Sequence, residues 1–120
     1  MLGLLLLLAA GAFVLHLAHA YPAGQGPFDH LPSGYVKSGA STPTVVTASS
    51  GRSYRTYTWP PNSGAQLFHV AERTDAPAWI AYWSTQGSDS RQLYGLRTPY
   101  ATGSAADATE AAALKRDFGV

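Results

Sequence analysis

The sequence predicts a mainly β fold: a small antiparallel meander of five strands, as an open sheet or a partly open barrel, with a C-terminal helix and an N-terminal hydrophobic helix. Short β-branched and aromatic segments recur roughly every dozen residues and are separated by Gly- and Pro-containing turns. An alanine-rich segment near the C-terminus has helix-capping residues at both ends. With 120 residues, there is room for one domain.

Residues 1–20 form a continuous apolar segment without a charged side chain, which predicts a signal peptide or a transmembrane anchor. Ala18-His19-Ala20 has the small-x-small form of a cleavage site, although no basic residue precedes the apolar stretch. If the segment is retained instead, a helix of this length reaches roughly 28 Å, enough to cross the hydrocarbon core of a bilayer. Both alternatives place the protein outside the cytoplasm, secreted or anchored to a membrane.

Two histidines, His16 and His19, lie three residues apart in this segment and would share one helical face. Polar side chains within a bilayer tend to be functional, so these are weak candidates for contacting a haem or a chlorophyll-type pigment. Residues 12–16 resemble the Ala-x-x-x-His pattern of light-harvesting polypeptides, over five residues and without the polar N-terminal arm of those proteins. The simpler interpretation is that both histidines lie at the interface or are removed with a signal peptide.

Residues 21–43 are rich in proline and glycine, which excludes a regular helix and predicts an extended arm. Phe28, Leu31, Tyr35 and Val36 make this arm more apolar than a flexible spacer needs to be. We therefore expect the arm to pack on the domain or on another subunit.

The β domain is expected over residues 44–100. Alternation along residues 53–59 separates two faces, with Tyr57 and Trp59 on the face opposite Tyr54. Residues 78–85 are the most apolar segment and are expected in the centre of the sheet. The expected strands are residues 44–47, 53–59, 66–72, 78–85 and 91–97.

Residues 104–118 are expected to form an amphipathic helix. Ser104 and Asp107 resemble a capping box, and Gly119 stands where a left-handed C-terminal residue belongs. Leu114 and Phe118, four residues apart, form an apolar stripe that could dock on the sheet.

Composition excludes several classes of function. The chain has no cysteine, so it has neither disulfides nor a thiolate metal site. Eight Lys and Arg residues against seven Asp and Glu residues give no basic surplus for binding nucleic acid.

No catalytic motif is recognisable, and we expect no enzymatic activity, cofactor or metal. His69 and Glu72 lie three residues apart on one expected strand and would project to opposite faces, and Asp29 and His30 lie in the arm, where we expect them to be exposed. The serines lack the Gly-x-Ser-x-Gly pattern of a nucleophile elbow. A small hydrolase is therefore the weakest of the functional hypotheses.

The aromatic residues are the strongest candidates for a binding surface. Trp79 and Trp83 share a face of their strand, with Tyr82 on the other. If one sheet face forms the core, some rings must be exposed and available for stacking on a sugar or a partner protein, while the alternative is an aromatic core. The candidate aromatic face consists of Arg55, Tyr57, Trp59, Trp79 and Trp83.

These observations favour a non-enzymatic accessory or structural subunit of a membrane-associated assembly, with other protein subunits as partners and the lipid bilayer as well if residues 1–20 are retained. It would dock through the arm and the aromatic face. The alternative is a secreted module that binds glycan or cell-wall material through aromatic side chains. A subunit that contacts pigment or haem through His16 or His19 is the weaker alternative.

Overall fold

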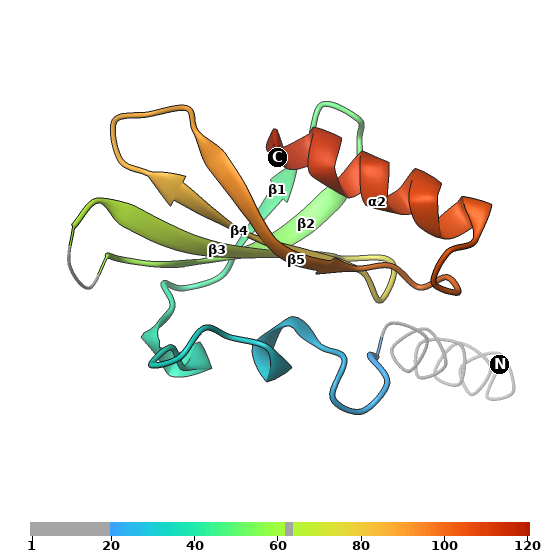
Figure 1. The fold of residues 1–120 in the computed structure, drawn as a ribbon, viewed down its shortest axis with the longest axis horizontal. Coiled ribbons are helices and arrows are strands. Elements are labelled where there is room, and N and C mark those ends of the chain that lie inside the picture. The colour runs from blue at the N-terminus through green and yellow to red at the C-terminus, as the bar shows by residue number, and fades with distance from the viewer. Residues whose placement is uncertain (1–19, 62–63) are drawn as a thin grey trace, which may run out of the picture.

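The computed structural model describes residues 20–61 and 64–120 of the chain. It confirms a mainly β architecture with a C-terminal helix (Figure 1). The expected N-terminal hydrophobic helix, with His16 and His19, lies outside the described residues. Among the described residues, no helix has the length and apolarity needed to cross a membrane. The elements are the short 3-10 helices η1 (Pro27–Asp29) and η2 (Lys37–Gly39), the strands β1 (Thr44–Thr47), β2 (Ser53–Trp59), β3 (Gln66–Arg73), β4 (Trp79–Thr85) and β5 (Arg91–Arg97), and the helix α2 (Ala105–Phe118).

The five strands form one antiparallel sheet in the order β1-β2-β3-β4-β5. Because the order follows the chain and β1 does not pair with β5, the sheet is open, and the barrel alternative is wrong. Each strand begins and ends within one residue of its expected bounds. The β4–β5 ladder contains one irregularity: Ala81 is opposite Gly95 and Tyr82 is opposite Leu93, which leaves Tyr94 without a direct partner.

The helix α2 covers one face of the sheet (Figure 1). Leu114 and Phe118 are buried there against Tyr54, Ile80 and Tyr82. The rings of Tyr54 and Phe118 meet edge to face, with centroids 4.7 Å apart. Since the helix is too short to be stable alone, this docking is what supports it.

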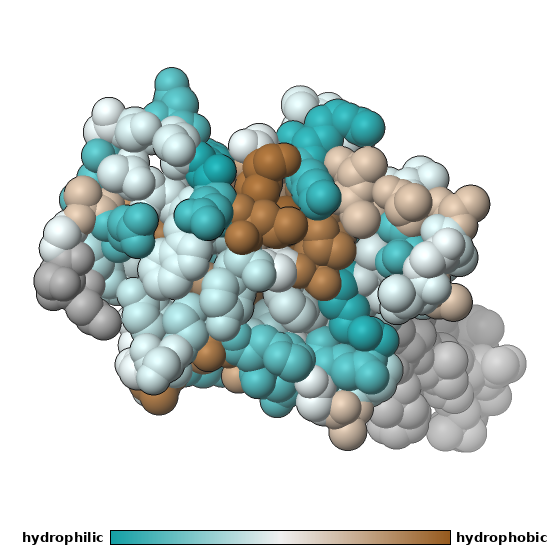
Figure 2. Space-filling view, in the orientation of Figure 1, coloured by the Kyte–Doolittle hydropathy of each residue, from teal (hydrophilic) through white to brown (hydrophobic). Residues whose placement is uncertain are grey.

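Apolar surface remains visible between β5 and the C-terminal end of α2 (Figure 2). Leu96 of β5 and Val120, which follows the helix, are partly buried against the helix-face core. The helix therefore leaves the β5 side of this core less completely covered than the β2 side, where Tyr54 is fully buried.

The arm covers the opposite face of the sheet (Figure 1). Partly buried arm side chains pack on a second core of sheet residues. The ring of Phe28 meets Tyr57 edge to face at 4.9 Å, and the ring of Tyr35 meets Phe68 in the same way at 5.7 Å. Burying apolar surface on both faces is how a sheet of only five short strands obtains two cores. The second core contains Tyr57, Trp59, Phe68, Val70, Trp79 and Ala81 from the sheet.

Both ends of α2 have the expected caps. The Ser104 side chain accepts a hydrogen bond from the backbone N–H of Asp107, and Gly119 adopts a left-handed conformation with φ of 66°. The Asp107 carboxylate accepts from Thr98 Oγ1 and Gly103 N–H rather than returning to Ser104. These hydrogen bonds, the Thr98 one foremost, lower the pKa of Asp107 and tie the start of the helix to the loop after β5.

Candidate functional site

The candidate aromatic face is the face beneath the arm. Tyr57, Trp59, Trp79 and Trp83 do lie on one side of the sheet, as their parity predicts. Trp59 and Trp79 are only 4 and 5% exposed, however, and Trp83 is partly buried. Arg55, at the exposed end of the row, remains accessible. These tryptophan rings therefore do not offer a platform to solvent in this conformation, because the arm already occupies it.

Polar contacts with the sheet hold the arm in place, among them hydrogen bonds made by Trp59, Trp79 and Tyr21. The indole N–H of Trp59 donates to the carbonyl of Val36 at 2.8 Å, and the indole N–H of Trp79 donates to the carbonyl of Gln25 at 2.9 Å. The Tyr21 hydroxyl donates to the Glu72 carboxylate at 3.0 Å. Burial and the neighbouring Glu72 charge both raise the pKa of Tyr21, so it stays a hydrogen-bond donor at neutral pH.

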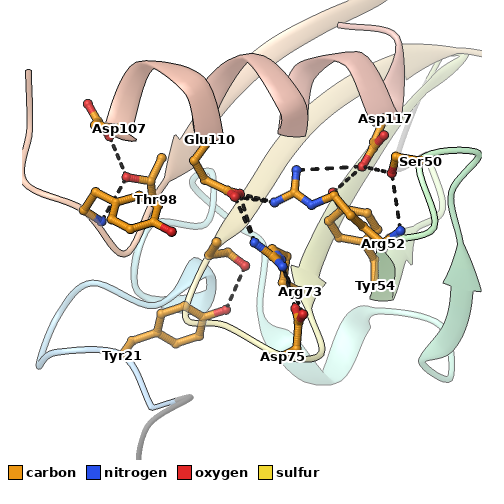
Figure 3. A network of polar contacts seen from close by, with 12 residues as sticks. Tyr21, Ser50, Arg52, Tyr54, Arg73, Asp75, Thr98, Asp107, Glu110 and Asp117 are labelled. Carbon is orange, nitrogen blue, oxygen red and sulfur yellow. Dashed lines mark hydrogen bonds and ion pairs between the residues drawn. The ribbon is translucent and has the colours of Figure 1, made fainter. Parts of the chain in front are cut away.

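A network of charged side chains lies between the sheet and α2 (Figure 3). The buried Glu110 carboxylate accepts from Arg52, in the turn before β2, and from Arg73 Nη1 at 2.9 Å. Arg73 also forms a two-point contact with Asp75 at 2.9 and 3.0 Å. One buried carboxylate thus serves two guanidinium groups, and removing it would leave both cations without that partner.

Asp117 extends this network at the other end of α2 (Figure 3). Its carboxylate accepts from Tyr54 Oη at 2.6 Å and from Ser50 Oγ at 2.9 Å. Burial, together with this hydrogen bond, raises the pKa of Tyr54. An acidic residue late in a helix opposes the helix dipole, and these two hydrogen bonds are the compensating interaction.

His69 lies in a row of hydroxyl side chains across three strands. Its Nε2 is 2.6 Å from Ser84 Oγ on β4, and its Nδ1 is 3.0 Å from Thr58 Oγ1 on β2. The ring stacks on Tyr82 with centroids 4.8 Å apart. Burial, with a smaller contribution from the positive charge of Arg91, lowers the pKa of His69 to about 4. The imidazole is therefore neutral at pH 7 but a weak base, and no carboxylate orients it as in a catalytic triad.

The other polar candidates stay apart. Glu72 projects to the arm face and His69 to the helix face, as strand parity predicts. Asp29 and His30 are exposed in the arm, as expected. Within residues 20–61 and 64–120, no group of three His, Cys, Asp or Glu side chains is placed to hold a metal ion.

The first strand is the most accessible part of the sheet. All four residues of β1 are exposed, and its two valines, Val45 and Val46, are 59% and 37% exposed. Its outer edge pairs with no other described strand. Unpaired N–H and C=O groups on such an edge are a template for strand addition.

Three of these features were not predicted from the sequence. The His69 row requires the cross-strand register, which places Thr58 and Tyr82 opposite His69 and puts Ser84 two residues beyond Tyr82, on the same face of β4. The Glu110 network did leave a signal, because Glu110 lies four residues before Leu114 on the apolar stripe of the helix. A charged residue within a buried stripe indicates a buried partner. The third feature is the accessible β1 edge. The four uncharged residues of β1 would suit a covered strand equally well, so the sequence does not show that this edge is exposed.

Similarity to known proteins assigns no function to these features. Comparisons of the chain with protein-family models, with curated proteins and with solved structures found no match.

Proposed function

We propose that this protein is a non-enzymatic accessory subunit of a membrane-associated assembly, outside the cytoplasm, and that it docks by adding its edge strand β1 to an extended segment of a neighbouring subunit. The observation that carries the proposal is the accessible, uncharged edge of β1. The arm and the aromatic face, which we expected to dock, pack on each other instead. Among the described residues, the free edge of β1 is therefore the surface that we propose for a partner.

The two edges of the sheet differ in how they are protected. Strand β5 carries Arg91 and Arg97 and an irregular register around Tyr94, and such charges and bulges discourage edge-to-edge pairing. Strand β1 has no charge, no proline and a regular register with β2. A partner strand would therefore meet less resistance at β1.

A shallow hollow of about 520 Å³ lies beside the start of β1. Tyr57, Pro43 and Lys37 are among its lining residues. Val45 pairs with Arg55, which shares a face of β2 with Tyr57, so this hollow is on the same side of the sheet as Val45. In strand addition, main-chain hydrogen bonds supply affinity and such side-chain pockets supply specificity.

Location rests on residues 1–20. Their largely apolar character, without a charged side chain, supports an exported or anchored protein. Intact-mass measurement on the native protein tests this: a retained segment supports the membrane anchor, and loss of the first 20 residues supports a cleaved signal peptide. Recovery of the intact chain from the cytosolic fraction would overturn the location.

The docking surface is tested with two matched valines. Val45→Lys places a charge on the β1 edge, whereas Val36→Lys places one on the arm, at a residue with nearly the same exposure of 60%. In detergent extracts analysed by native electrophoresis, we expect the wild type and Val36→Lys to migrate in a large assembly and Val45→Lys to be released from it. Migration of the wild type as a monomer, or an assembly insensitive to Val45→Lys, would overturn the proposal. If the purified protein is a dimer and Val45→Lys dissociates it, the partner of β1 is a second copy of this chain and not a different subunit.

A further inference from the structure

A second hollow, of about 460 Å³, lies between the arm and the β4–β5 side of the sheet. This volume is in the range of small-molecule sites. The arm contributes Gln25, His30 and Leu31, and the sheet contributes Trp79, Tyr94 and Arg97. It lies beside β5, at the opposite edge of the sheet from β1.

The walls of this hollow are held by contacts within the protein. Trp79 is fixed by its hydrogen bond to the Gln25 carbonyl, and the Tyr94 hydroxyl donates to the His30 carbonyl at 2.7 Å. The His30 and Trp79 rings stack at 6.2 Å with an interplanar angle of 24°. A ligand would thus meet a preformed site and lose little free energy in ordering it.

The polar groups of the hollow comprise one cation and several acceptors. Arg97 makes no salt bridge to any residue in the part of the chain that the structure describes. Gln25 Oε1 is buried and accepts no hydrogen bond from a described residue. His30 Nε2 lies 2.8 Å from the Gly24 carbonyl and must carry the hydrogen, so Nδ1 of the neutral ring is an acceptor. The Tyr94 oxygen, which donates its proton to His30, can also accept.

We propose that this hollow binds an acidic monosaccharide, that is, a hydroxylated ring bearing a carboxylate. The carboxylate pairs with the Arg97 guanidinium, whose planar donors match it. The hydroxyl groups donate to Gln25 Oε1 and to His30 Nδ1, and the apolar C–H face of the ring lies against the partly buried Leu31. A phosphate would leave the acceptors without donors.

Nuclear magnetic resonance of the indole N–H groups tests the site in the full chain in detergent micelles. Titration with glucuronate should shift the Trp79 signal in a saturable way and leave the Trp59 signal, whose N–H is held by Val36 on another part of the arm, unchanged. Glucose, which lacks the carboxylate, and free L-alanine, which lacks the hydroxyl groups, serve as comparison ligands. We expect both to bind at least about tenfold more weakly than glucuronate, since a hydrogen bond to a charged group is lost or several hydroxyl contacts are missing.

Two variants locate the ligand. Arg97→Gln should weaken glucuronate binding about tenfold or more, and Arg116→Gln, which removes an exposed arginine of α2, should not change it. Gly95→Ala would place its Cβ 3.5 Å from the edge of Trp79, an ordinary contact, so the variant keeps the fold while it narrows the hollow and weakens binding.

Three outcomes would overturn the assignment. In the first, the Trp79 signal does not shift at millimolar glucuronate. In the second, glucose binds as tightly as glucuronate. In the third, L-alanine binds and glucuronate does not. Because none involves β1, they are separable from a failure of the proposed docking.

Discussion

Arg73 on β3 and Glu110 on α2 are joined by a hydrogen-bonded ion pair, with Nη1 and Oε1 2.9 Å apart. The pair connects residues 37 positions apart in the chain and ties the helix to the sheet. Arg52 approaches the same carboxylate from the turn before β2. The position of α2 on the sheet therefore depends on charge pairing as well as on the burial of Leu114 and Phe118.

Glu110→Ala should destabilise the protein by about 3 kcal/mol, because both arginines keep their partly buried positions and lose the shared carboxylate. Urea unfolding monitored by tryptophan fluorescence measures the change. Asp89→Ala, which removes an exposed carboxylate from the β4–β5 loop, is the matched control and should change stability little. A loss below about 1 kcal/mol for Glu110→Ala would show that the network contributes little.

Stability should fall as the pH is lowered from 6.5 towards 4. The pKa of His69 is lowered from 6.5 to about 4 by burial, so within this window the unfolded chain binds a proton that the folded protein does not. The folded state loses about 2 kcal/mol across the window, a figure reduced from the full shift because the ring is half-buried. Below about pH 4, His69 is protonated in the folded and in the unfolded protein, so it causes no further loss of stability.

Unfolding by urea at a series of pH values tests this dependence. His69→Gln should flatten the profile between pH 4 and 6.5, and His30→Gln, which alters an exposed imidazole, should retain the wild-type slope. Equal slopes for His69→Gln and the wild type would contradict the assignment to His69.

Phe28→Ala should loosen the arm from the sheet. The ring packs edge to face on Tyr57 and lies 6.4 Å from Trp59, so its removal should cost about 2 kcal/mol, less than for a fully buried phenylalanine because the ring is half-buried. Tryptophan emission should shift to longer wavelength as Trp59 becomes hydrated. Val36→Ala, at an exposed arm position, is the control. Unchanged emission would mean that other residues of the arm are sufficient to hold it on the sheet.

Ser104→Ala should destabilise the protein by about 1 kcal/mol. The Ser104 hydroxyl accepts from the backbone N–H of Asp107 at 3.1 Å, and alanine would leave that group without its cap. Ser104→Asp should retain most of the stability, because a carboxylate can accept the same hydrogen bond. Thermal unfolding distinguishes the two substitutions, and equal stability of the alanine variant would show that Asp107 N–H has an alternative acceptor.

The strands and the helix are predictable because local patterns determine them. The alternation in β2 assigns Tyr54 to one face and Tyr57 and Trp59 to the other, and the structure confirms this assignment. Ser104 and Gly119 mark the ends of α2 for reasons internal to the helix. The open sheet could not be separated from a barrel, because a two-residue period contains no information on whether β1 reaches β5.

The candidate site was less predictable, because it depends on which surfaces meet. An exposed aromatic platform required that only one face of so small a sheet form a core, and the structure covers both faces. The apolar residues of the arm, such as Phe28 and Tyr35, indicated that it packs on something without indicating the surface. The acceptors Gln25 and His30 join Arg97 only once the arm lies on the sheet, so no sequence spacing reveals them.

The arm and α2, which cover the two faces of the sheet, come from opposite ends of the described chain. This affects the order in which the protein can fold during synthesis. Tyr21 emerges from the ribosome long before its hydrogen-bond partner Glu72, 51 positions later, and Tyr54 waits for Asp117, 63 positions later. The proline-rich arm cannot form premature regular structure during that interval. Neither layer can be completed while the sheet is still being translated, so folding should finish only after residue 118 has been released.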